Sequence, residues 1–274
     1  MNLVDVHMHL THEQFAPDRA DVVKRAYDVG VRAIVVNGLE PLSNRLILDW
    51  CAADPYHILK PAVGIYPLDA VNSLLPGDFP HRISRFDVDG EIAFIKKLAL
   101  GKKIIAVGEC GLDGYYVDEP YFAEQERVFD ALIQVAIEAD LPIIIHSRKR
   151  EQRVAEMLAF RKAKKVDFHC FGGRTKHAQK WAEDYGWHFS IPANSRKNEA
   201  FASLLRNLPF QNILTETDAP YLGPQRGERN ESANVKGTVE HLAELRGIGF
   251  QEAASQVWMN YQTLFESTIN FNGI

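Results

Sequence analysis

The sequence lacks long apolar runs, a basic amino-terminal leader and any cysteine-rich segment. Its three cysteines, Cys51, Cys110 and Cys170, are too widely spaced for a disulfide framework or a CxxC metal site, so we expect reduced thiols. Cys110 and Cys170 each follow a candidate ligand, and strand alternation predicts that they point away from it, buried and inert. Because no stretch is long enough to span a membrane, we expect a cytoplasmic protein without membrane contact.

Low-complexity segments and long charge runs are also lacking, which argues against disorder. A hydrophobic fraction of 46% with 24% charged residues is typical of a globular enzyme. The net charge of −5 argues against a protein that coats polyanions, although it allows a local basic patch. No linker-like stretch interrupts the chain, so we predict a single domain over residues 1–274. No feature predicts an obligate protein partner or a particular oligomeric state.

Short apolar segments alternate with helical patterns along the chain. We predict strands at residues 1–10, 31–36, 58–64, 103–107, 141–145, 166–168, 187–191 and 213–217. This alternation predicts an α/β fold, a parallel (β/α)8 TIM barrel, with an open doubly wound sheet as the alternative. Two further helices, at 235–246 and 250–265, follow the eighth strand.

Residues with metal-binding chemistry stand at the ends of several predicted strands. They are His7, His9, Glu109, His146, His169 and Asp218. The carboxyl ends of the strands of a parallel barrel share one face, so these side chains are predicted to meet there. For any single histidine, a hydrogen-bonded core position is the alternative. Together, four histidines and two carboxylates favour a metal centre.

The ligand set exceeds the needs of one tetrahedral ion, so we predict two divalent cations, with Mg, Mn and Zn all compatible. We assign Glu109 as the bridge, His7, His9 and Asp218 to one ion, and His146 and His169 to the other. Asp218 is also the predicted general base. Three more acids, Asp5, Asp113 and Glu216, are placed beside the ligands. Asp5 is expected to orient a histidine, Asp113 to orient a ligand or hold its loop, and Glu216 to support a ligand or line the barrel interior.

Five motifs carry a family resemblance. They are Asp5-x-His7-x-His9, Gly108-Glu-Cys-Gly-Leu-Asp113, Leu141-Pro-x-x-x-His146-Ser147-Arg148, His169-Cys-Phe-Gly-Gly173 and Thr215-Glu-Thr-Asp-Ala-Pro-Tyr221. In combination, and over nearly the whole chain, they resemble the TatD-type metal-dependent deoxyribonucleases of the amidohydrolase superfamily. The resemblance implies metal-dependent hydrolysis of DNA phosphodiesters, often exonucleolytic. Two positions depart from the family pattern, Tyr66 for a histidine and Gly173 for a serine, and both concern substrate handling.

Basic residues in the loops after the strands give a further indication of the substrate. Arg148, Arg174 and Arg229 belong to these loops, and cations near helix amino termini favour an external anion such as phosphate. Four aromatic residues at the rim could stack unpaired bases, with core or rim packing as the alternative: Tyr66, Tyr115, Tyr116 and Tyr221. Solvated surface charges are the alternative for the arginines. We predict a hydrolase that cleaves DNA phosphodiesters with a two-metal-activated water, as an exonuclease on single-stranded ends. The alternatives are a deacylase or lactonase for a small substrate, and a catalytically idle metal-stabilised binding protein.

Overall fold

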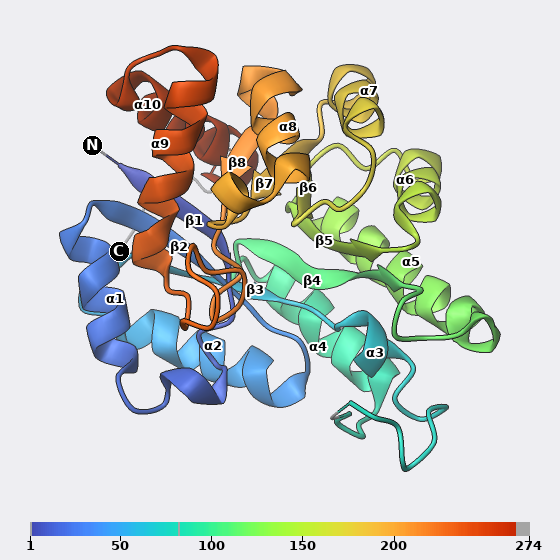
Figure 1. The fold of residues 1–274 in the computed structure, drawn as a ribbon. Helices are drawn as coiled ribbons and strands as arrows, with labels where there is room; N and C mark the ends of the chain where they lie inside the picture. Colours follow the sequence, from blue (N-terminus) through green and yellow to red (C-terminus); the bar gives the residue numbers. More distant parts are fainter. Residues whose placement is uncertain (1, 82, 267–274) are drawn as a thin grey trace.

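The computed structural model describes residues 2–81 and 83–266, in which strands and helices alternate around a barrel (Figure 1). The strands are β1 (Leu3–Met8), β2 (Val31–Asn37), β3 (Leu59–Val63), β4 (Ala106–Asp113), β5 (Ile143–Arg148), β6 (Val166–His169), β7 (His188–Ile191) and β8 (Ile213–Thr215). Each strand pairs in parallel with the next one along the chain. This order confirms the predicted (β/α)8 barrel, because a doubly wound sheet would depart from chain order.

The helices lie outside the barrel (Figure 1). They are α1 (Arg19–Asp28), α2 (Pro41–Ala53), α3 (Pro67–Ala70), α4 (Val88–Leu100), α5 (Phe122–Ala139), α6 (Glu151–Phe160), α7 (Thr175–Tyr185), α8 (Glu199–Asn207), α9 (Val235–Arg246) and α10 (Phe250–Tyr261). Short 3-10 helices are η1 (Glu13–Phe15), η2 (Glu119–Tyr121), η3 (Ser195–Lys197), η4 (Phe210–Asn212) and η5 (Ser232–Asn234), and η6 (Gln262–Glu266) is a π-helix. The two predicted additional helices correspond to α9 and to α10 with η6. Within the described ranges, no helix has the length and apolar character needed to cross a membrane.

Closure of the barrel joins β1 to the segment that follows β8. The backbone N–H of Asp218 donates to the carbonyl oxygen of His7 at 2.8 Å, and the N–H of His9 donates to the carbonyl oxygen of Ala219 at 2.9 Å. These bonds satisfy backbone groups that would otherwise be buried without partners. They also hold three of the predicted metal ligands together from opposite ends of the chain.

Two strands extend further than the sequence predicted. The ladder between β4 and β5 continues past Glu109 and His146, pairing Gly111 with His146 and Asp113 with Arg148. Gly111 permits this close approach, because a Cβ there would lie 2.0 Å from the carbonyl oxygen of His146, and its φ of +147° is strained for other residues. Glu109 and His146 therefore project from within paired strands, and the strand pairing fixes the position of their backbone.

Candidate metal centre

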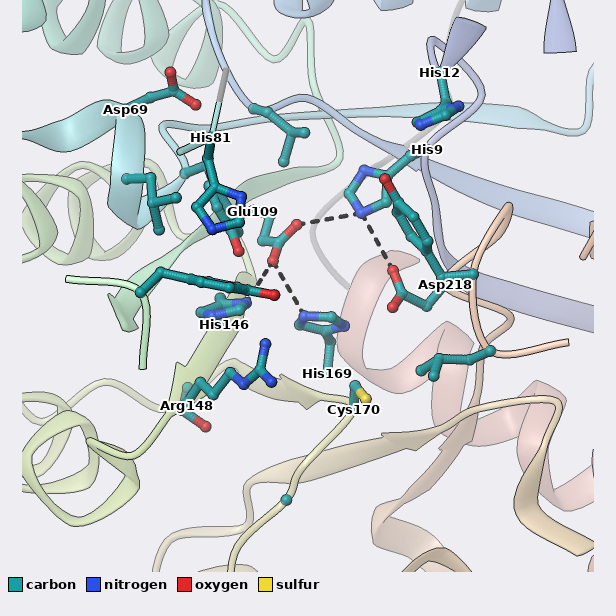
Figure 2. A pocket seen from close by; sticks show the side chains of 18 of the residues that line it. His9, His12, Asp69, His81, Glu109, His146, Arg148, His169, Cys170 and Asp218 are labelled. Atoms are coloured by element: carbon teal, nitrogen blue, oxygen red, sulfur yellow. Dashed lines mark hydrogen bonds and ion pairs between the residues drawn. The ribbon is translucent and has the colours of Figure 1, made fainter. Parts of the chain in front are cut away.

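The six predicted ligands converge at the carboxyl face of the barrel, and Figure 2 shows all of them except His7. His7 belongs to β1, Glu109 to β4, His146 to β5 and His169 to β6. His9 directly follows β1, and Asp218 lies three residues after the end of β8. All six side chains are buried or nearly so. Residues from across the sequence thus form one compact cluster of nitrogen and oxygen donors.

Glu109 lies at the centre of this cluster. Its Oε2 is 3.4 Å from Nε2 of His7 and 3.4 Å from Nε2 of His9. Its Oε1 is 3.0 Å from Nδ1 of His146 and 3.1 Å from Nε2 of His169. Each carboxylate oxygen therefore faces a different histidine pair, and Glu109 is shared by two donor sets.

Asp218 approaches the first of these sets. Its Oδ1 lies 3.3 Å from Nε2 of His9 and 3.9 Å from Nε2 of His7. The two imidazole nitrogens are themselves 3.2 Å apart. This arrangement matches the predicted grouping of His7, His9 and Asp218 on one side of Glu109, opposite His146 and His169.

The donor atoms fit divalent cations. Ligand atoms around a tetrahedral zinc ion, with bonds of about 2.0–2.1 Å, lie roughly 3.3 Å apart, which is close to the spacings around Glu109. Glu109 Oε2 is buried without a hydrogen-bond partner among the described residues. A buried carboxylate oxygen in that state is costly unless a cation compensates for it. Mixed nitrogen and oxygen donors accept zinc, manganese and magnesium, so the chemistry of the set fits the predicted group.

Protonation suits cation binding at His7 and Glu109, whereas at the other three histidines a cation would displace a proton. Burial, together with the charge of nearby His169, lowers the pKa of His7 to about 4, so its imidazole is neutral at pH 7. Burial acts to raise the pKa of Glu109, but the imidazoles of His169 and His146 hold it well below its usual value. Burial acts to lower the pKa of His9, His146 and His169, but the neighbouring carboxylates raise it. Neutral imidazole and ionised carboxylate are the forms that coordinate metals.

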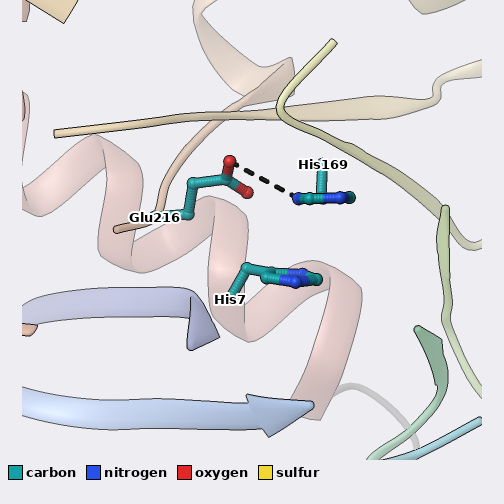
Figure 3. Close-up of side chains that lie close together, drawn as sticks. All are labelled: His7, His169 and Glu216. Atoms are coloured by element: carbon teal, nitrogen blue, oxygen red, sulfur yellow. Dashed lines mark ion pairs between the residues drawn. The ribbon is translucent and has the colours of Figure 1, made fainter. Parts of the chain in front are cut away.

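Glu216 and His7 flank His169 on the barrel side of the centre (Figure 3). The His7 and His169 rings stack with centroids 3.8 Å apart and an interplanar angle of 11°. Glu216 is fully buried, and its Oε1 lies 3.7 Å from Nδ1 of His169. Glu216 therefore lines the barrel interior and also faces a ligand ring, so the two roles considered for it coincide.

Asp5 contacts backbone rather than a histidine ring. Its Oδ1 accepts from the N–H groups of His7 at 3.2 Å and Thr217 at 2.9 Å, and its Oδ2 accepts from the hydroxyls of Thr217 and Ser232. The expectation that Asp5 orients an imidazole is thus replaced by a different role. Asp5 ties the end of β1 to the segment after β8, which positions His7 through its main chain.

Asp113 links a ligand to the loop that follows β4. Its Oδ2 is 3.0 Å from Nε2 of His146, and its Oδ1 accepts from the backbone N–H groups of Tyr115 at 2.8 Å and Tyr116 at 2.7 Å. Both roles considered for Asp113, orienting a ligand and holding its loop, are present. A carboxylate on Nε2–H leaves Nδ1 of His146 unprotonated and turned towards Glu109.

A cavity of about 850 Å³ opens above the centre. Of the predicted substrate residues, Tyr66 and Arg148 line it, together with Glu109, His146 and Asp218. The ring of Tyr66 meets that of His146 edge to face at 5.0 Å, in the place where the family resemblance led us to expect a histidine.

The other two predicted substrate residues lie outside this cavity. The guanidinium of Arg229 is held by both carboxylate oxygens of Asp18 at 2.7 Å and by the carbonyl oxygen of Gln14. Arg174 is an exposed residue at the start of α7 and is not among the cavity-lining residues. Arg229 therefore fastens the loop after β8 to the start of α1, a structural contact that the loop position alone did not reveal.

Sequence reasoning also missed residues of the cavity wall. His12, Asp69 and His81 line the cavity, and Cys170 does so as well, contrary to the expectation that it turns away (Figure 2). The chain leaves the strand at His169, and Cys170 adopts a left-handed φ of +45°, so strand alternation no longer applies to it. Burial still raises the pKa of the Cys170 thiol well above its usual value, so it stays protonated.

Similarity to known proteins extends over nearly the whole chain. A sequence model of the TatD-related DNase family matches residues 4–266. The uncharacterized metal-dependent hydrolase YabD of Bacillus subtilis is 32% identical over 268 residues, covering 96% of this chain and 98% of YabD. The 3'-5' ssDNA/RNA exonuclease TatD of Salmonella typhimurium is 32% identical over 275 residues, covering 96% of this chain and 99% of that enzyme.

Solved structures agree with these matches. The TatD homologue YJJV of Escherichia coli superimposes with a TM-score of 0.81 at 25% identity, covering 96% of this chain and 98% of the other. A TatD-family hydrolase from Entamoeba histolytica, at 18% identity and a TM-score of 0.83, has the same fold. With a matching family model, relatives of nearly full length and the converged ligand cluster, the chain belongs to the family of TatD-related DNases.

Proposed function

We propose that this protein is a two-metal deoxyribonuclease that removes nucleotides from single-stranded DNA ends. The main support for this proposal is that each carboxylate oxygen of Glu109 faces a different histidine pair, at the floor of an open cavity. The name of the Salmonella relative, a 3'-5' ssDNA/RNA exonuclease, supports the strand type and the direction of cleavage. We propose His7, His9, Glu109 and Asp218 as ligands of one cation, and Glu109, His146 and His169 as ligands of the other.

The chain's own residues divide the catalytic work. Two bound cations would supply a hydroxide nucleophile at neutral pH and neutralise charge on the phosphoryl oxygens. Asp218 lines the cavity, and although burial acts to raise its pKa, its bond with His9 and the neighbouring imidazoles lower it. Its ionised carboxylate is placed to take the proton of the attacking water. Burial raises the pKa of Tyr66, which therefore offers a neutral ring and hydroxyl beside His146.

Arg148 is the proposed contact for the substrate phosphate. It lines the cavity, and among residues 2–81 and 83–266 no carboxylate forms an ion pair with its guanidinium. The neighbouring Arg150 is instead paired with Glu126. An arginine without a protein anion beside a metal centre is a natural partner for a phosphodiester oxygen.

End-labelled DNA tests this proposal. Metal-loaded protein should shorten a 5'-labelled single-stranded oligonucleotide stepwise and release a single labelled mononucleotide from a 3'-labelled one. Glu109→Ala, purified identically, should lose this activity. Undigested DNA at high protein concentration would refute the proposal, and equal activity in Glu109→Ala would identify a contaminating nuclease. If DNA persists while ester or N-acyl amino acid substrates are hydrolysed, the deacylase or lactonase alternative replaces it. Metal binding without any hydrolysis would leave the idle binding protein.

A further inference from the structure

One wall of the cavity is built from aromatic side chains that the catalytic scheme leaves unused, beside Arg148, the proposed phosphate contact. The loop after β4 supplies Tyr116, which lines the cavity, and Tyr115, which is not among the lining residues; their rings meet edge to face at 4.9 Å. The guanidinium carbon of Arg148 lies 3.7 Å from the ring centroid of Tyr115 and 4.8 Å from that of Tyr116. These distances place a cation beside two π systems within contact range.

A histidine from a different loop completes this wall. His81 belongs to the long segment between β3 and α4, and its ring lies 4.3 Å from that of Tyr116 at an interplanar angle of 66°. His81, Tyr116 and Arg148 all line the same cavity as Glu109, and Figure 2 shows His81 and Arg148 on the side of His146. Three elements thus bring planar groups to one side of the metal centre.

The wall is fixed relative to the metal centre. The Asp113 carboxylate accepts a hydrogen bond from Nε2–H of His146 and also from the backbone N–H of Tyr116, the latter at 2.7 Å. Gln125 of α5 accepts the N–H of Asp113 at 3.2 Å and donates to the carbonyl oxygen of Pro67 at 3.2 Å. The same network therefore orients a metal ligand, the tyrosine loop and the start of the loop that carries His81.

Planar groups at a fixed distance from a phosphate site suit a nucleobase. Bases of a single strand expose their faces and stack on aromatic rings and guanidinium planes, whereas bases inside a duplex are already stacked on their neighbours. A volume of about 850 Å³ is of the size that encloses a small ligand, so it suits one or two nucleotides.

We propose that Tyr116, flanked by His81 and Arg148, is a stacking platform for the unpaired base of a nucleotide adjacent to the scissile phosphate. This inference rests on the proposed function and adds a reason for it to act on single strands. The platform reads the presence of a free base rather than its identity, because every base has a π face. Cleavage should therefore depend on the base being present and unpaired, with little preference among the four bases.

The test combines an abasic nucleotide with variants of the wall. Metal-loaded protein is titrated with a fluorescent single-stranded oligonucleotide whose terminal linkages are uncleavable methylphosphonates, with or without one abasic residue near the 3' end. In the wild type, the abasic residue should weaken binding by about 5- to 150-fold, the range expected for the loss of one stacked base. In Tyr116→Leu this abasic penalty should largely vanish, whereas Tyr116→Phe should keep it.

Two further variants provide a second test and a control for this result. His81→Ala removes an exposed loop side chain and should reduce the abasic penalty in part, so the inference stays testable if Tyr116→Leu fails to fold. Tyr185→Ala removes a half-exposed tyrosine that stacks on Trp187 outside the cavity and should leave the penalty unchanged. A 2-aminopurine at the same position should be quenched by wild-type protein and less so by Tyr116→Leu.

The outcomes separate the two proposals. If the wild type cleaves DNA but the abasic penalty is the same in Tyr116→Leu and His81→Ala, the stacking platform is refuted and the nuclease function stands. If an abasic residue costs the wild type nothing, the platform is refuted as well. A wild type that neither cleaves nor binds single-stranded DNA would overturn both proposals.

Discussion

Replacing Asp113 with asparagine should change which ring nitrogen of His146 faces the cations. Asparagine keeps the size of the side chain but replaces one acceptor oxygen with an NH2 donor. The remaining oxygen is held by the backbone N–H groups of Tyr115 and Tyr116, so the NH2 group takes the place of Oδ2. In the variant this NH2 group faces Nε2–H of His146, which lies 3.0 Å from Oδ2 in the wild type. Two hydrogen-bond donors then point at each other. The imidazole relieves this conflict by moving its proton to Nδ1, the nitrogen that faces Glu109.

The expected loss follows from that tautomer. A protonated Nδ1 cannot coordinate a cation, and changes to groups that orient a ligand weaken metal binding by about 10- to 100-fold, or about 1.4 to 2.7 kcal/mol. Only the donor set that contains His146 and His169 should be affected, because the other set contacts the opposite oxygen of Glu109. Calorimetric titration of the metal-free protein with zinc or manganese should therefore resolve one weakened site and one unchanged site.

Asp130 offers a matched control for Asp113. Asp130→Asn makes the same chemical change on α5, where Asp130 pairs with Arg161 outside the cavity, and should leave both metal affinities as in the wild type. Wild-type affinities at both sites in Asp113→Asn would refute the tautomer argument. Equal weakening of both sites would show instead that Asp113 supports the whole centre rather than one ligand.

Three further results are expected. Elemental analysis should find both ions depleted in Glu109→Ala but one ion retained in His146→Ala; equal losses would refute Glu109 as the bridge. The slope of the logarithm of DNA affinity against the logarithm of salt concentration should fall by about one in Arg148→Ala and by less in Arg174→Ala. Equal slopes in the two variants would refute Arg148 as the phosphate contact. Burial raises the pKa of Asp69 to about 7, so the folded state retains a proton that the unfolded chain releases above about pH 4. Urea titrations should show the free energy of unfolding falling from pH 4 to 7, by up to about 4 kcal/mol, and Asp69→Asn should lack this component; parallel pH profiles would contradict it.

The fold was predictable because its signal is repeated. Apolar strands and amphipathic helices alternate through the chain, and parallel pairing in chain order leaves few arrangements other than a closed barrel. The ends of β4 and β5 were less predictable. Their ladder continues because Gly111 lets two backbones approach, and whether a glycine serves a turn or such a contact depends on the neighbouring strand.

The ligand cluster was predictable for a related reason. Each ligand stands at or near the end of a predicted strand, and barrel topology alone brings those ends to one face. Arg229 was misplaced because its partner, Asp18, lies 211 residues away in the sequence, and no local pattern encodes that pair. His81 was missed since it lies in an irregular loop, where neither periodicity nor strand position marks a residue that reaches the cavity.

Beneath the metal centre the barrel interior is polar, and this explains how His169 keeps a fixed orientation. The hydroxyl of Ser190 lies 3.1 Å from Oδ2 of Asp167 and 2.5 Å from Oε2 of Glu216, yet it carries one proton and can donate to only one of them. Burial, reinforced by the charge of Glu216, raises the pKa of Asp167 to about 8, so we infer that Asp167 is protonated and donates to Ser190, which donates to Glu216. The free Oε1 of Glu216 then faces Nδ1 of His169, and both atoms lack a hydrogen-bond partner among the described residues. That pairing favours a proton on Nδ1 and leaves Nε2 as the nitrogen turned towards Glu109. Buried acids that would be a liability in an apolar barrel thus select the tautomer that the metal centre needs.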